Sequence, residues 1–86
     1  MTAVRAFTVE TKAAKTARLQ SEWLASAAHY LFKLNVYDIT DPQEVSQAYE
    51  LAETLWDGSE NEDFEDASEW LGAEDAVDEE LTYWGD

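Results

Sequence analysis

The sequence TKAAKTARLQSEWLASAAHYLFKL, residues 11–34, sets the fold expected for this chain. Its apolar residues recur near the i, i+4, i+7, i+8 spacing of one wide helical face, at Leu19, Trp23, Ala27, Tyr30, Leu31 and Leu34. The polar residues between them would face outward. We therefore predict a central core helix over residues 11–34.

A second helix is predicted from residue 42 because Asp41, Pro42 and Glu44 form a helix start. Asp is a favoured N-cap, and Pro is favoured at the first helical position. Glu three residues after the cap can complete a capping box. The apolar stripe that follows continues to Trp56, and Gly58 would end the helix. These signals predict a helix over residues 42–57.

Two shorter acidic helices are predicted beyond Gly58, over residues 60–71 and 73–84. Ser59 and Glu62 repeat the capping pattern ahead of a short apolar stripe that would end at Gly72. A weaker stripe follows, before Gly85. The fold class expected for this single acidic domain, residues 1–86, is mainly α, a compact bundle of three to four helices.

β-branched and aromatic residues concentrate in two short segments, residues 4–9 and 35–39. The first would make residues 1–10 an extended arm or a strand. The second could be a connector or a second strand. One short two-stranded pair formed by these segments therefore stays open, and it would need a helix to pack on.

The charge of this 86-residue chain is strongly negative, at a formal −15, and unevenly distributed. All five basic residues lie in the first 33 residues with two acids, and the other 18 acids follow with no basic residue among them. Residues 57–86 hold 13 carboxylates. If helical throughout, these thirty residues would span about 45 Å, with a carboxylate about every 3.5 Å. Phosphates on one DNA strand are about 3.4 Å apart along the axis.

Such a charge opposes folding through self-repulsion, which is consistent with a surface that meets a basic partner. Solubility of a small domain needs a net charge of only about 2 to 8. A solvated acidic face kept for solubility is the first alternative. Adaptation to high salt is the second, although that would spread acids over nearly the whole surface.

Catalysis and metal binding have no support in the residue pattern. The chain has no Cys and one His, His29, and no serine lies in a nucleophile elbow. A calcium-loop pattern starting at Asp57 fails where Glu62 replaces the required glycine and Ser68 replaces the final Glu. We therefore expect no enzyme activity, no cofactor and no specific metal site.

Residues 1–10 lack the pattern of a signal peptide, and the longest apolar patch, residues 24–34, is shorter than the ~20 residues of a membrane span. The expected setting is therefore intracellular, without a membrane partner. Direct nucleic-acid binding by the acidic face is excluded because its charge would repel phosphates.

In charge pattern, residues 38–86 resemble the small DNA-mimic inhibitors made by phages and mobile elements, the anti-restriction, anti-CRISPR and uracil-glycosylase-inhibitor proteins. The resemblance is one of composition, and those proteins do not share one fold. It implies that carboxylates replace phosphates in the basic nucleic-acid groove of a host complex, such as a CRISPR effector or a restriction enzyme, in the cytoplasm of the host bacterial cell.

The contact set expected for such an inhibitor consists of acids in the last thirty residues: Asp57, Glu60, Glu62, Asp63, Glu65, Asp66, Glu69, Glu74, Asp75, Asp78, Glu79 and Glu80. Trp70 and Trp84 would hold the scaffold beneath them. The alternative function is an acidic adaptor or antitoxin-like module that masks a single basic partner protein.

Overall fold

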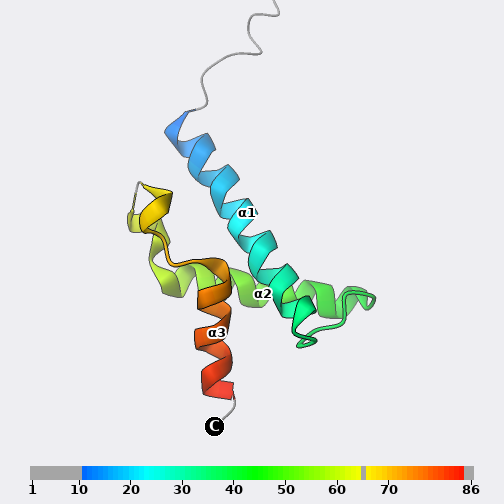
Figure 1. The fold of residues 1–86 in the computed structure, drawn as a ribbon. Coiled ribbons are helices and arrows are strands. Elements are labelled where there is room, and N and C mark those ends of the chain that lie inside the picture. The colour runs from blue at the N-terminus through cyan, green and yellow to red at the C-terminus, as the bar shows by residue number, and fades with distance from the viewer. Residues whose placement is uncertain (1–10, 65, 85–86) are drawn as a thin grey trace, which may run out of the picture.

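The computed structural model describes residues 11–64 and 66–84, and this part of the chain is mainly helical. Three α-helices, α1 (Lys12–Lys33), α2 (Pro42–Ser59) and α3 (Ala73–Trp84), account for most of it. Two single-turn 3₁₀ helices, η2 (Asn61–Asp63) and η3 (Ala67–Glu69), lie between α2 and α3 (Figure 1). The predicted mainly α class is confirmed, with three α-helices.

Helix α1 packs on α2 and α3 through its C-terminal half only. The Thr11 hydroxyl caps its start by accepting a hydrogen bond from the Ala14 N–H at 3.0 Å. Its buried residues begin at Trp23 and continue with Ala27, Ala28 and Leu31. Leu19, expected in the core, is half-buried, and Leu34 is exposed. The N-terminal half therefore extends beyond the helical body, as Figure 1 shows.

The start of α2 follows the predicted capping signal. The Asp41 carboxylate accepts a hydrogen bond from the Gln43 N–H at 3.0 Å, and Pro42 is the first helical residue. Glu44 reaches further back than in a capping box, because it accepts from the Asp38 N–H at 2.9 Å. The Asp41 N–H is bonded instead to the Asp38 carbonyl at 3.1 Å. These contacts fix the loop before α2 to its first turn.

The two-stranded pair that the sequence left open is not shown by the described residues. Residues 35–39 form turns and bends, and the described residues contain no strand. Asn35 takes a left-handed conformation, with φ of 62°, at the end of α1, and this redirects the chain. Residues 4–9, and the arm predicted over 1–10, lie outside the described residues.

Two buried tryptophans, Trp23 and Trp56, lie in the core, and the half-buried Trp70 packs against them. Trp56, 1% exposed, makes edge-to-face contacts with Trp23 and Trp70, with ring centroids 5.3 Å and 4.9 Å apart. Around them the helices meet through small side chains, notably Ala27, Ala28, Ala48 and Ala52, all fully buried. Small residues allow close approach of helix backbones, so a short chain can bury its large rings between them.

The backbone of Leu71 anchors the connection between α2 and α3. Its carbonyl accepts hydrogen bonds from Trp23 Nε1 at 2.8 Å and from Asn61 Nδ2 at 3.2 Å. Its N–H donates to Asn61 Oδ1 at 2.9 Å. Asn61 is 1% exposed and is the one buried polar residue in the described part of the chain. The Asn61 side chain therefore pairs with both backbone polar groups of Leu71, as a neighbouring strand would in a sheet.

The helix predicted over residues 60–71 is wrong. Helix α2 continues through Gly58 to Ser59, whose hydroxyl donates to the Trp56 carbonyl at 2.7 Å and accepts from the Asn61 N–H at 3.2 Å. Ser59 therefore helps to end a helix where it was expected to start one. Glu60 then turns left-handed, with φ of 59°. Asn61 and Leu71 would be about 15 Å apart in a continuous helix, so their pairing excludes one.

Replacing Asn61 with alanine should destabilise the fold by about 2 to 3 kcal/mol, because the partly buried Leu71 N–H loses its partner and the Leu71 carbonyl loses one of its two partners. Chemical denaturation would measure the change. Gln47→Ala, which removes an exposed amide from α2, is the matched control and should change stability by less than about 0.5 kcal/mol. Equal effects of the two variants would contradict the role given to Asn61.

Replacing Glu60 with glycine should stabilise the fold by about 0.5 to 1 kcal/mol, because glycine adopts a positive φ without steric cost. The substitution also removes a negative charge. Glu60→Gln removes that charge and keeps the side chain, so the difference between the two variants in unfolding free energy isolates the backbone effect. A glycine variant no more stable than the glutamine variant would show that the left-handed turn carries no strain.

Candidate acidic binding surface

Eleven of the twelve acids predicted to contact a partner lie in the described residues, and Glu65 lies outside them. Ten of the eleven are exposed and Glu80 is half-buried. Their carboxylates are carried by the end of α2, by the folded segment that follows it, and by α3. The shape of the acidic surface therefore depends on how the segment between α2 and α3 folds.

Four of these acids border one hollow at the end of α2. Asp57, Glu60, Glu62 and Asp63 line it together with Trp56, around a volume of about 180 Å³. Glu62 accepts a hydrogen bond from Trp56 Nε1 at 3.1 Å, so the buried indole is satisfied by a surface carboxylate. The left-handed turn at Glu60 directs η2 back toward α2 and brings the four side chains together.

Two further acids, absent from the predicted set, extend this surface along α2. Glu50 and Glu53 are exposed. The spacing of three residues from Glu50 to Glu53, and of four from Glu53 to Asp57, places all three on the helix face away from the core. Along the helix axis these charges are about 4.5 to 6 Å apart, wider than the phosphates of one DNA strand. The spacing was visible in the sequence, but the prediction covered only the last thirty residues.

The acids of α3 face two directions. Asp78 accepts a hydrogen bond from the Tyr30 hydroxyl of α1 at 2.8 Å, and Glu74 and Asp75 border a hollow beside Trp23. Glu79 and Glu80 line the opposite side, toward α2. The straight row expected for a continuous acidic helix is therefore absent from the described residues. The carboxylates instead cover several sides of the molecule.

Internal hydrogen bonds hold four of the eleven acids, namely Glu62, Asp66, Asp78 and Glu80. Asp66 caps η3 by accepting from the Ser68 N–H at 2.9 Å; this bond lowers the pKa of Asp66, and the nearby charge of Lys15 lowers it further. Asp78 raises the pKa of Tyr30, chiefly through their hydrogen bond. The other seven, with no side-chain bond to another described residue, are Asp57, Glu60, Asp63, Glu69, Glu74, Asp75 and Glu79.

Positive charge is concentrated on the half of α1 that extends from the body, at Lys12, Lys15 and Arg18. Arg18 forms an ion pair with Glu22 of the same helix at 3.2 Å. A hollow separates this half of α1 from Glu62 and the exposed ring of Phe64. Between described residues, no ion pair joins the predicted contact set to a basic side chain.

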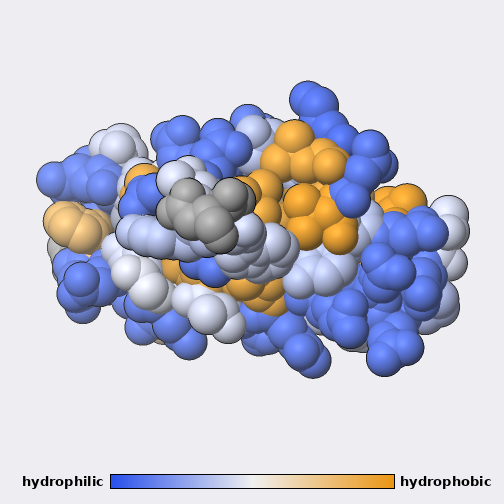
Figure 2. Space-filling view, turned by 90° about the horizontal axis from the view of Figure 1, so that it is seen from below, coloured by the Kyte–Doolittle hydropathy of each residue, from blue (hydrophilic) through white to orange (hydrophobic). Residues whose placement is uncertain are grey.

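The two tryptophans expected to support the surface have different roles. Trp70 packs on Trp56 and donates from Nε1 to the Phe64 carbonyl at 3.0 Å. Trp84, at the end of α3, is 49% exposed and donates to Glu80 at 2.9 Å. Trp70 is part of the core, whereas Trp84 is part of the surface. Seen from below, that surface combines apolar areas with hydrophilic side chains (Figure 2).

Neither a metal cage nor a membrane span is found in the described part of the chain. No group of three or more His, Asp or Glu side chains there is arranged to hold a metal ion, and no helix there has the length and apolarity to cross a membrane. His29 is exposed, with its ring 6.1 Å from that of Phe32. No protein-family model, curated protein or solved structure matches the chain.

Because the acids repel one another, added salt should stabilise the protein at pH 7. Raising sodium chloride from about 20 mM to about 500 mM shortens the Debye length from roughly 20 Å to roughly 4 Å. We expect Tm to rise by about 5 °C in calorimetry. A variant combining Glu50→Gln, Glu53→Gln and Asp57→Asn should start at a higher Tm and gain less from salt. A Tm that falls with salt would contradict net repulsion.

Proposed function

We propose that this protein is a stoichiometric inhibitor whose carboxylates occupy the basic nucleic-acid groove of a host defence complex, such as a CRISPR effector or a restriction enzyme. The observation that carries the proposal is a set of exposed acids without basic partners among the described residues. A groove built from Lys and Arg to hold phosphates attracts such a surface for the same electrostatic reason.

The fold supports this function by presenting charges from ordered elements. The α2 row of Glu50, Glu53 and Asp57 leads directly to the hollow formed with Glu60 and Asp63. Charges on preformed helices bind without a large ordering cost. Because acids also lie on α3, the surface suits a groove with basic walls on more than one side, as duplex DNA carries phosphates on two strands.

The alternative, an acidic adaptor or antitoxin-like module that masks one basic protein, is favoured by a different observation. Tyr83 and Trp84, at the end of α3, are 72% and 49% exposed. Exposed aromatic side chains are frequent binding anchors. An adaptor anchored in this way would depend on one ring and tolerate most losses of charge.

A competition experiment tests the proposed function and separates it from the alternative. The protein at micromolar excess should displace labelled DNA from at least one member of a panel of purified CRISPR effectors and restriction enzymes. Stepwise substitution of Glu53, Asp57 and Asp63 by their amides should weaken inhibition by roughly threefold at each step. Trp84→Ser, the matched control at an exposed ring, should leave it unchanged.

Inhibition should also weaken as salt rises, because exposed charges are screened. Failure to displace DNA from any member of the panel would contradict the proposed function. Loss of partner binding in Trp84→Ser, with tolerance of the three amide substitutions, would favour the adaptor.

A further inference from the structure

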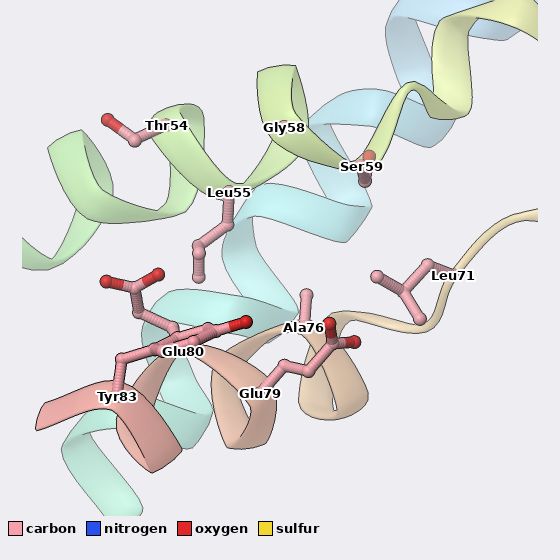
Figure 3. Close-up of a pocket in the computed structure, with 9 residues that line it drawn as sticks. All are labelled: Thr54, Leu55, Gly58, Ser59, Leu71, Ala76, Glu79, Glu80 and Tyr83. Atoms are coloured by element: carbon pink, nitrogen blue, oxygen red, sulfur yellow. The ribbon is translucent and has the colours of Figure 1, made fainter. Parts of the chain in front are cut away.

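A cleft of about 280 Å³ separates the C-terminal half of α2 from α3 (Figure 3). Leu55 from α2 and Ala76 from α3 point into it, and Leu71 lies at one end. Leu55 and Leu71 are half-buried, so the apolar lining is reachable from solvent. On the α3 side, Glu79, Glu80 and Tyr83 border the cleft.

Gly58 gives independent reason to regard the cleft as a binding site. Its φ is not positive, and a Cβ built on it would meet nothing within 4 Å. Neither the backbone nor the packing therefore requires glycine at this helical position, where alanine would favour the helix. Because glycine has no side chain, the cleft stays open at this position, beside Leu55 (Figure 3).

The size and the charge of the cleft restrict what it can hold. Its volume is below the range of about 300 to 1,000 Å³ that is usual for small-molecule pockets. It can hold an apolar side chain that projects from a partner's surface. The carboxylates of Glu79 and Glu80 at its border attract positive charge and disfavour an acidic segment.

We infer that the α2–α3 cleft receives one apolar side chain from a basic segment of the partner protein, with flanking Lys or Arg side chains against Glu79 and Glu80. This inference rests on the proposed function and adds to it a point of specific docking. The carboxylates attract many basic surfaces, whereas the cleft selects those with an apolar residue at the right place. An apolar anchor in a pocket with a polar rim is a common source of binding energy.

Two synthetic peptides serve as probes, a fluorescein-labelled lysine-rich peptide with one central phenylalanine and the same peptide with glycine at its centre. Fluorescence anisotropy at low salt should give about tenfold tighter binding of the phenylalanine peptide, since burial of one apolar side chain supplies that factor. Gly58→Leu, which fills the cleft, should abolish this preference and leave binding of the glycine peptide unchanged. Asp57→Asn, on another face of α2, should weaken both peptides equally and keep the preference.

Circular dichroism and thermal denaturation verify that Gly58→Leu is folded, and Gly58→Ala, which should keep the preference, controls for the loss of glycine. Equal binding of both peptides, or a preference that survives Gly58→Leu, would overturn the inference. If the glycine peptide binds and DNA is displaced while no preference exists, the cleft inference alone fails. If neither peptide binds and no DNA is displaced, the proposed function fails as well. Self-association that Gly58→Leu abolishes would assign the cleft to a second copy of the chain and overturn the inference.

Discussion

The hydrogen bonds at the Leu71 backbone are the constraint on which the rest of the fold depends. One carbonyl joins Trp23 of α1 to Asn61 in the connection, and both bonds lie next to the tryptophan cluster. They fix the point from which α3 begins, two residues later. They also place Trp70 against Trp56. The positions of the acids in the connection and on α3 therefore follow from an interaction in which no acid takes part.

The fold accommodates strong self-repulsion because apolar contacts and carboxylates are separated within the same elements. In α3, Ala73, Ala76 and Val77 face the core, while Glu74 and Asp75 face solvent. Where apolar side chains and carboxylates meet, tryptophan N–H groups donate hydrogen bonds to the carboxylates. The indole N–H groups of Trp56 and Trp84 donate to Glu62 and Glu80, which hold charge at the surface. Among the described residues no buried side-chain donor is left unsatisfied.

Local signals in the sequence predicted the helices well and the connection between them poorly. Asp41 and Pro42 act on neighbouring backbone groups, so the start of α2 could be predicted directly from the sequence. Ser59 and Glu62 gave an equally good start signal, but the pairing of Asn61 with Leu71 prevailed over it. Composition predicted that the acids would be exposed. Their division among several sides could not be predicted, because it depends on that long-range pairing.

The extended half of α1 gives the molecule a large electric dipole. Lys12, Lys15 and Arg18 lie near the N-terminus of α1, which itself bears partial positive charge, and all described acids except Glu22 lie beyond α1. In the field of the basic groove proposed as its target, such a molecule would rotate before contact until its positive tip points away. For the proposed inhibitor, orientation on arrival would thus be selected at a distance, before any side chain meets the groove.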